Sequence, residues 1–162
     1  MHQEYFYAKI YLKIYGAMDD IMCLFQSTYE TKVSFEDLDP MNIVWHGNYM
    51  RYLEQARCDL FSKINYTYAN IKEDGFAYPV AKMKVKYIKP AFFEDILVIK
   101  TSVISIEPAL EINYDIYNKK TDEKILEAYT MQILIDIETK QSVYTPPKRL
   151  IEKIKGIKNE KN

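Results

Sequence analysis

The chain has 162 residues, a formal net charge of −1 and 48% hydrophobic residues, which is enough for one domain with a sizeable core. The near-neutral charge argues against a protein that binds nucleic acid or anionic membranes through a strong positive field. No window approaches the roughly 18 continuous apolar residues of a membrane span, and Glu4, Lys9 and Lys13 interrupt any signal-peptide core. Cys23 and Cys58 form no CxxC pattern, so we predict a soluble, cytoplasmic protein.

Residues 1–28 give no clear structural signal. The apolar residues between Tyr5 and Ile14 fit a strand and a helix equally well. Asp19 or Asp20 would cap a short helix that continues through Gln26. We therefore treat residues 1–28 as an N-terminal extension of unclear structure.

The stretch that follows changes from the period of a strand to the period of a helix. Alternation from Tyr29 to Glu36 predicts a half-buried strand. A loop then reaches about Gly47, and Asn48 is the expected helix cap. A helix is predicted from Tyr49 to Ile64, because apolar residues recur there on one face: Tyr49, Leu53, Ala56, Leu60 and Ile64.

Strands dominate the rest of the chain. A loose region at 65–77 contains a turn at 73–75. Alternation predicts strands at 81–87, 96–106, 110–116 and 125–137, and a short strand at 143–144. A C-terminal helix is expected to start at Pro147 and end near Gly156, and residues 158–162 are expected to fray.

Two of these strands have distinctive faces. On 81–87 one face is apolar and the other basic, with Lys82, Lys84 and Lys86. On 125–137 one face carries large apolar residues: Tyr129, Met131, Ile133, Ile135 and Ile137.

The order of elements indicates the fold class. Hairpins imply antiparallel pairing. A strand, a long helix and four or more hairpin-linked strands therefore predict an α+β domain, with the helix against one face of an antiparallel sheet. There is no internal repeat or linker, so we predict one domain at 29–157.

The stretch from strand to helix resembles the 4-hydroxybenzoyl-CoA thioesterase family, and is similar to the acyl-CoA thioesterases associated with the Tol-Pal system. This resemblance implies the hotdog fold, an antiparallel sheet wrapped around one long central helix. It also implies homodimers or dimers of dimers with sites at the subunit interface. The residues that carry it are Asp37-Leu38-Asp39-Pro40, Ile43-Val44-Trp45-His46, Asn48-Tyr49 and Tyr52-Leu53-Glu54-Gln55-Ala56-Arg57.

The resemblance assigns the main catalytic role to Asp39, as nucleophile on the thioester carbonyl or as general base for water. Without it, Asp39-Pro40 would be read as an ordinary turn. The backbone N–H of His46 is expected to polarise the carbonyl, while its side chain either assists near neutral pH or only completes the helix entry. Asn42 replaces the glycine of many relatives, and asparagine tolerates positive φ. Asp37 is expected to be a loop or cap residue.

Other residues of the motif have expected roles of lesser weight. Trp45, Tyr49 and Tyr78 are predicted to contact substrate. Trp45 is also expected to pack under the loop, and an ordinary core position is an equal alternative for Tyr78. Glu54 is a reserve catalytic candidate, although an ion pair with Arg57, three residues later, is the simpler interpretation.

The predicted function is hydrolysis of an acyl-CoA with a small or medium acyl group, aromatic groups included. Acyl carrier protein is the other candidate carrier of the acyl group. A dehydratase and a non-catalytic acyl-binding module are further alternatives. Dehydratases of this fold place a histidine and a carboxylate across the dimer interface, whereas His46 is on the thioesterase loop. We expect no metal, because His2 and His46 make no ligand pattern, and no cofactor, because no phosphate loop or dinucleotide fingerprint is present.

Overall fold

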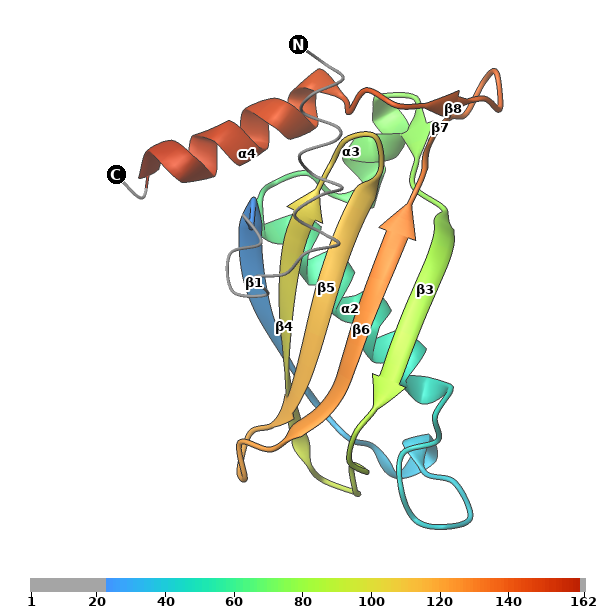
Figure 1. The fold of residues 1–162 in the computed structure, drawn as a ribbon, viewed down its shortest axis with the longest axis vertical. Helices are drawn as coiled ribbons and strands as arrows, with labels where there is room; N and C mark the ends of the chain where they lie inside the picture. The colour runs from blue at the N-terminus through green and yellow to red at the C-terminus, as the bar shows by residue number, and fades with distance from the viewer. Residues whose placement is uncertain (1–22, 161–162) are drawn as a thin grey trace, which may run out of the picture.

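The computed structural model describes residues 23–160 and shows a five-stranded sheet with a long helix on one face (Figure 1). All neighbouring strands of this sheet pair antiparallel. The α+β class and the antiparallel sheet are therefore confirmed. The order of strands across the sheet is β1 (Phe25–Lys32), β4 (Ile96–Ser105), β5 (Leu110–Asn118), β6 (Lys124–Gln132) and β3 (Val80–Tyr87).

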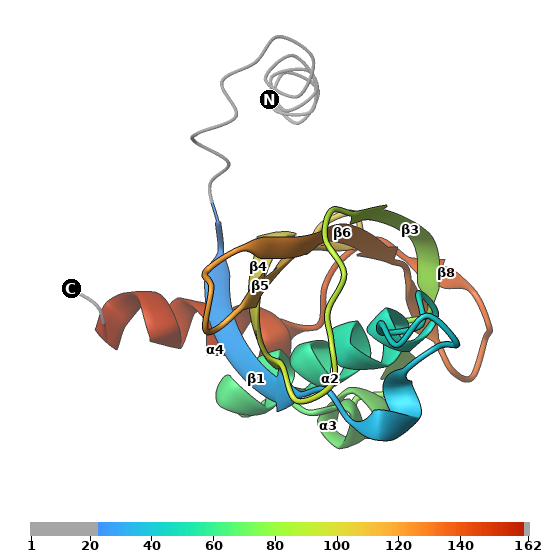
Figure 2. The ribbon, with the colours of Figure 1, turned by 90° about the horizontal axis from the view of Figure 1, so that it is seen from below.

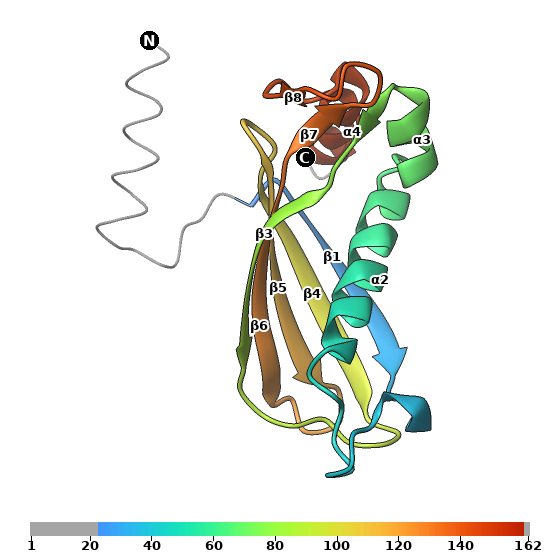
Figure 3. The same cartoon turned by 90° about the vertical axis from the view of Figure 1, so that its right-hand side faces the viewer.

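Helix α2 (Asn48–Lys63) is the element around which the sheet curves (Figures 2 and 3). Its predicted extent is confirmed within one residue at each end. The predicted cap is wrong, because Gly47 occupies the N-cap position and the Asn48 amide instead donates to the Asp37 carbonyl at 2.9 Å. The buried face of the helix packs on alternating residues of β4 and β5, and burying one such side chain contributes about 1.5–3 kcal/mol. The residues of this interface are Tyr52, Leu53, Ala56, Leu60, Phe61, Leu97, Ile99, Val103, Ile112, Tyr114 and Ile116.

The first strand lies nearer the N-terminus than we predicted. It begins at Phe25 and ends at Lys32, so the predicted strand at 29–36 is wrong in its second half. The chain turns at Ser34, whose N–H donates to the Asp37 carboxylate at 3.0 Å, and Phe35–Asp37 forms a 3-10 turn, η1. Phe35 continues the apolar alternation although its side chain is 75% exposed, which explains the error. The predicted helix through Gln26 is wrong over its last residues, and the rest of it lies outside the described residues.

Strand β6 buries the face opposite to its large apolar residues. Thr130 is 1% exposed and Gln132 is 0% exposed, whereas Tyr129 and Met131 are only half-buried. The buried polar residues have partners, since Tyr114 and Thr130 share a hydrogen bond of 3.2 Å and Gln132 bonds Thr130 at 2.6 Å. The chain also breaks at residue 133, so the single strand predicted at 125–137 is two strands, β6 and β7 (Leu134–Asp136).

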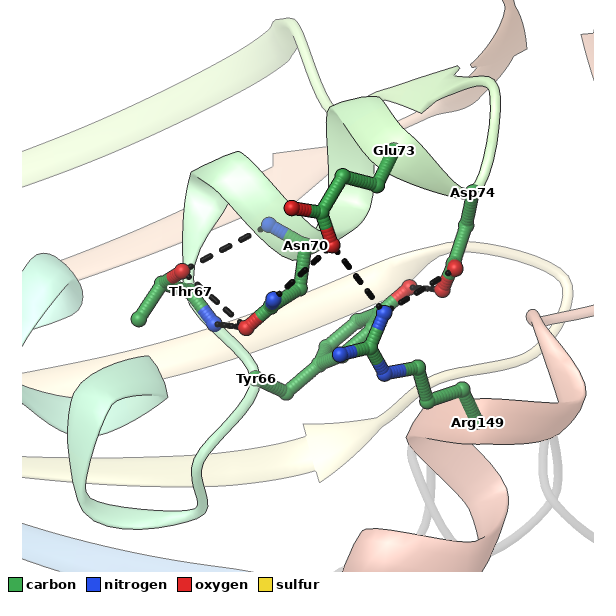
Figure 4. Close-up of polar contacts among 6 residues, drawn as sticks. All are labelled: Tyr66, Thr67, Asn70, Glu73, Asp74 and Arg149. Atoms are coloured by element: carbon green, nitrogen blue, oxygen red, sulfur yellow. Dashed lines mark hydrogen bonds and ion pairs between the residues drawn. The ribbon is translucent and has the colours of Figure 1, made fainter.

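One end of the molecule is closed by a short helix, which the sequence did not reveal, and by a second sheet, whose last strand was predicted to within one residue. Helix α3 (Tyr68–Glu73) lies in the region predicted as loose, and a second sheet joins β2 (Phe76–Ala77), β7 and β8 (Ser142–Val143). The helix is started by a reciprocal pair, because Thr67 N–H donates to the Asn70 side chain at 3.0 Å and Asn70 N–H donates back to the Thr67 hydroxyl. This pair is visible in Figure 4.

Helix α4 (Lys148–Glu160) is fastened to α3 through Arg149 (Figure 4). The Arg149 guanidinium lies 3.2 Å from Asp74 and 3.4 Å from Glu73, and it sits over the Tyr66 ring at 5.8 Å. The Tyr66 hydroxyl donates to Asp74 at 3.0 Å. The helix continues past Gly156, so the predicted end at that glycine is wrong.

Candidate active site

The candidate loop, residues 37–47, is a short hairpin between η1 and α2. Asp39 N–H donates to the Ile43 carbonyl at 2.8 Å, and Trp45 N–H donates to the Asp37 carbonyl at 2.9 Å. Residue 39 therefore lies opposite residue 43, and residue 37 lies opposite residue 45. The loop emerges at the end of the sheet opposite to α4, beside the last residues of β3 (Figure 1).

Asp39 closes the tip of this hairpin. One carboxylate oxygen accepts the Met41 N–H at 2.8 Å, and the Asp39 carbonyl accepts the Asn42 N–H at 2.9 Å. Within residues 23–160, no basic side chain pairs with Asp39. Asn42 has φ of 61°, which confirms the expected left-handed conformation at this position. The Asp39 carboxylate is thus fixed by its own turn while one of its oxygens stays available to other groups.

Trp45, His46 and Gly47 form the turn that enters α2. The Trp45 indole is 48% exposed, so the expectation that it packs under the loop is wrong for the single chain. Its ring lies over Gly47, where an added Cβ would be 2.2 Å from a ring carbon. The rings of Trp45 and His46 are 5.0 Å apart. Gly47 has φ of −68°, so the requirement for glycine here is one of space.

The backbone of this turn presents two free donors. The Trp45 carbonyl accepts the Asn48 N–H at 2.9 Å, and the His46 carbonyl accepts the Tyr87 hydroxyl at 3.1 Å. Because C=O and N–H point in opposite directions across a trans peptide, the N–H groups of His46 and Gly47 point away from those bonds. Neither N–H has an acceptor among residues 23–160. They lie at the N-terminus of a 16-residue helix, where developing negative charge is stabilised.

Aromatic side chains link this turn to α2 and to β3. The Tyr49 ring lies 5.7 Å from the Tyr87 ring, and the His46 ring lies 6.3 Å from Tyr87. Tyr49 is 3% exposed, and burial raises the pKa of its hydroxyl to about 12. The structure therefore places His46 and Tyr49 against Tyr87, and Trp45 beside His46.

Tyr78 is not part of this group within one chain. It precedes β3, whereas the loop lies at the end of β3, and nine residues of strand at about 3.3 Å each span about 30 Å. Its side chain is 6% exposed, and its hydroxyl has no hydrogen-bond partner in the structure. Burial raises the pKa of this hydroxyl. Its predicted role in substrate binding stays a prediction.

Glu54 lies on α2, away from the hairpin. It pairs with the Arg57 guanidinium, three residues later, so the simpler interpretation of this residue is confirmed. Arg57 is 6% exposed and also donates to the Tyr68 hydroxyl at 2.6 Å. Glu54 is six residues beyond the start of α2, about 9 Å along the axis, and its reserve catalytic role stays a prediction.

Sequence analysis missed one contact of Asp37 and the whole role of Tyr87. Asp37 accepts the N–H of Ser34, the N-cap of η1, so the expectation of a loop or cap residue is confirmed. The hydrogen bond that its buried carboxylate accepts from Tyr52 on α2 was not predicted. Tyr87 was not singled out, because it lies at the end of an alternating strand and no motif includes it.

Comparison with known proteins agrees with the fold and the loop. The family model described as "Thioesterase-like superfamily" matches residues 33–154. The chain belongs to the thioesterase-like superfamily. That match covers the hairpin, α2 and four strands of the main sheet, and it leaves out β1.

Members of this superfamily with known names give the same result. A putative acyl-CoA thioesterase of Bacillus subtilis is 27% identical over 114 residues, covering 70% of this chain and 82% of the relative. A DHNA-CoA thioesterase of Staphylococcus aureus superposes with a TM-score of 0.72 at 26% identity, covering 85% of this chain and 95% of that one. A 1,4-dihydroxy-2-naphthoyl-CoA thioesterase from Synechocystis has a TM-score of 0.72 at 20% identity, covering 83% and 98%. The fold is the hotdog fold, as the resemblance implied.

Two negative observations bound the site. Among the described residues, no helix has the length and hydropathy needed to cross a membrane, and no group of side chains there is arranged to hold a metal ion. A hollow of about 470 Å³ lies between α3 and the start of α4, lined by residues that include Asp74, Phe76 and Arg149. It is at the opposite end from the hairpin and is not part of the candidate site.

Proposed function

We propose that this chain is a thioester hydrolase that cleaves acyl-CoA with a small or medium acyl group, aromatic groups included. The observation that carries the proposal is the pair of free N–H groups at His46 and Gly47, on the same hairpin as the unpaired Asp39 carboxylate. Thioester hydrolysis requires a base or nucleophile and donors for the developing oxyanion. The names of the relatives point to the same chemistry.

Two routes use these groups. In the first, Asp39 removes a proton from water, the water oxygen attacks the carbonyl carbon, and the His46 and Gly47 N–H groups bind the resulting oxyanion. The C–S bond then breaks, and the thiolate of CoA takes up the proton. In the second, the Asp39 carboxylate attacks the carbonyl carbon itself and displaces the thiolate, which leaves a mixed anhydride that water hydrolyses to the free acid and Asp39.

The deciding experiment measures thiol release from short, long and aromatic acyl-CoAs by the wild type and by Asp39→Asn. We expect the wild type to hydrolyse at least one ester and the variant to lose about 10²-fold or more in kcat. The control is Asp122→Asn, because Asp122 is exposed and has a positive φ of 55° that asparagine tolerates. An unimpaired Asp39→Asn would move the assignment to Glu54. An inactive wild type would favour acyl carrier protein as the carrier, or binding without turnover, and the same panel on carrier-protein thioesters separates these.

We further propose a homodimer that pairs through β3. This edge strand is exposed on both faces, and only Val85 is half-buried. Val80 is 45% exposed, Met83 36% and Tyr87 49%, so no part of residues 23–160 covers the apolar face of β3. An edge strand with unpaired backbone groups is a template for another strand, and a two-fold axis pairs it with its own copy.

The hairpin also supports this dimer. In an antiparallel pairing of two β3 strands, the start of one strand lies beside the end of the other. Tyr78 of the second chain would then lie towards the loop of the first chain. Within one chain, by contrast, Tyr78 and the loop are about 30 Å apart. Sedimentation equilibrium should give twice the chain mass, and Met83→Asp should shift the protein to monomer. Tyr144→Asp is the control, because Tyr144 is 66% exposed outside β3. A wild-type monomer at the concentrations used for activity would contradict the dimer.

We place the protein in the cytoplasm, because Cys23 and Cys58 are both free, as expected in a reducing compartment. Fractionation of cells that express a tagged chain tests this location, with recovery in the cytosolic fraction as the expected result.

A further inference from the structure

Asp37 joins the start of η1 to α2 through a buried carboxylate. Asp37 is only 1% exposed. One oxygen accepts the Ser34 N–H at 3.0 Å and the Tyr52 hydroxyl at 2.6 Å, and the other accepts the Arg51 guanidinium. A carboxylate this buried is retained only where donors satisfy it, and here they come from η1 and from the second turn of α2.

The backbone carbonyl of the same residue holds the return leg of the hairpin. It accepts the Trp45 N–H at 2.9 Å and the Asn48 amide at 2.9 Å. Trp45 and Asn48 are also bonded to each other, because the Trp45 carbonyl accepts the Asn48 N–H at 2.9 Å. Asp37 therefore bonds both residues that set the orientation of the Trp45–His46 peptide.

That peptide carries one of the two free donors. Its carbonyl is held by Asn48, so its other side, the His46 N–H, has a fixed direction. Oxyanion donors act through preorganisation, and their contribution falls when the donor is free to reorient. Residues that hold the peptide in place therefore set the strength of the donor without touching the substrate.

We infer that Asp37, with Arg51 and Tyr52 as its anchors on α2, is the positioning residue for the oxyanion donor at His46. This inference rests on the proposed function. Loss of an anchor is expected to lower kcat while KM changes little, because the donor acts on the transition state more than on the bound ester.

The test compares Tyr52→Phe with Tyr66→Phe. Both substitutions remove one hydroxyl from a buried tyrosine that donates to an aspartate, Asp37 in the first and Asp74 in the second. Tyr66 lies beside α3 and Arg149 (Figure 4), whereas the hairpin lies at the opposite end of the sheet from α3 (Figure 1). We expect both variants to lose thermal stability, but only Tyr52→Phe to lose about tenfold in kcat, with KM within about twofold. Asp37→Asn should lose more in kcat than Tyr52→Phe.

Two CoA analogues give a readout that a purely structural role would not change. A thioether analogue has no carbonyl to be polarised, whereas the hydrate of a trifluoromethyl ketone analogue carries the oxygen of the tetrahedral intermediate. We expect Tyr52→Phe to weaken the ketone by about the same factor as kcat/KM and to leave the thioether affinity unchanged. Unchanged kcat and ketone affinity per folded molecule in Tyr52→Phe would overturn the inference, whether or not Asp37→Asn folds. If Asp39→Asn abolishes turnover and Tyr52→Phe does not affect it, only this inference fails. If the wild type hydrolyses no thioester, the proposed function fails with it.

Discussion

The hydroxyl of Tyr87 donates a hydrogen bond of 3.1 Å to the backbone carbonyl of His46. Tyr87 is the last residue of β3, the edge strand that is exposed on both faces. The bond ties the strand at which we expect two subunits to meet to the turn that carries the free N–H groups. If two chains pair through β3 as proposed, one side chain would connect dimer formation with the geometry of the donors.

Replacing Tyr87 with phenylalanine should weaken catalysis without removing its ring contacts with His46 and Tyr49. The lost bond is worth about 0.5–1.5 kcal/mol, so we expect kcat to fall roughly two- to tenfold. Steady-state thiol release checks this, with Tyr144→Phe as the control because Tyr144 is exposed and distant. Equal kcat in wild type and Tyr87→Phe would show that the bond does not orient the turn.

Gly47→Ala should displace the Trp45 ring. The new Cβ would lie 2.2 Å from that ring, which is closer than two non-bonded carbon atoms can approach. Because Trp45 is the only tryptophan of the chain, its fluorescence reports the displacement directly. We expect a shifted emission maximum and a loss of about tenfold or more in kcat, since small misplacements at a reacting centre are costly.

The matched control for that variant is Gly156→Ala. Gly156 lies within α4 and has no atom within 4 Å of an added Cβ, so alanine should stabilise the helix by about 0.5–1 kcal/mol. An altered emission in Gly47→Ala with full activity would mean that the ring position does not matter to the donors.

The subunits should complement each other if Tyr78 serves the partner's hairpin. We expect Asp39→Asn and Tyr78→Ala to be weakly active alone and to regain activity when they are unfolded and refolded together. Each mixed dimer then has one intact site, so about a quarter of all sites are restored for random pairing. Activity that equals the mean of the two separate variants would place both residues in the same chain's site or remove Tyr78 from it.

Stability should fall at alkaline pH because Tyr49 keeps its proton when folded. The pKa of its hydroxyl is raised by burial to about 12, against about 10 in an unfolded chain. Below pH 10 both states are protonated, and the stabilisation is fully present. Between about pH 10 and 12 only the unfolded state releases its proton, so the free energy of unfolding falls by about 1.4 kcal/mol per pH unit from this group.

Urea unfolding at a series of pH values measures that slope. Burial also raises the pKa of Tyr52, Tyr66 and Tyr78, so the wild-type slope should be steeper than one tyrosine gives. Tyr49→Phe should flatten it, whereas Tyr144→Phe should not. A slope unchanged by Tyr49→Phe would show that this hydroxyl titrates alike in both states.

The fold was largely predictable because its signals are local and strong. The apolar face of α2 and the alternation in β5 both survive as buried surfaces, with Leu53, Ala56, Ile112 and Ile116 at 2% exposure or less. The end of β1 was misplaced because Phe35 is apolar and yet exposed. No local pattern distinguishes an apolar residue that faces the core from one that faces a partner or solvent.

Strand β6 shows the opposite case, in which polar residues are buried although the sequence pattern favours their exposure. Thr130 and Gln132 are buried because Tyr114 on β5 and Arg57 on α2 lie beside them. Those partners are far away in sequence, so the alternation alone predicts that the outer, more apolar face of β6 is the buried one. Helix α3 was missed for a related reason, since six residues held by a Thr67–Asn70 pair carry too short a pattern to read.

The candidate site was predictable only where a motif names it. Asp39, Trp45, His46 and Tyr49 follow from the resemblance, and the structure places His46 and Tyr49 against Tyr87, with Trp45 beside His46. Asp37 and Tyr87 act through contacts with η1, α2 and β3, and such contacts exist only once the chain has folded. Tyr78 lies at the other end of β3, so the contact with the hairpin that we propose for it would need a second chain.

The ion pairs between Arg149 and the end of α3 bear on the order in which the chain can fold during its synthesis. A chain is synthesised from its N-terminus, and folding follows that order. Every described strand lies before Lys148, whereas the arginine that holds Glu73 and Asp74 comes after all of them. The sheet can therefore assemble while α3 is still loose, and α4, which follows every described strand, closes that end afterwards. A stop codon just before Arg149 would leave every described strand in the product, and would remove the arginine together with the buried Leu150 and Ile154 of α4.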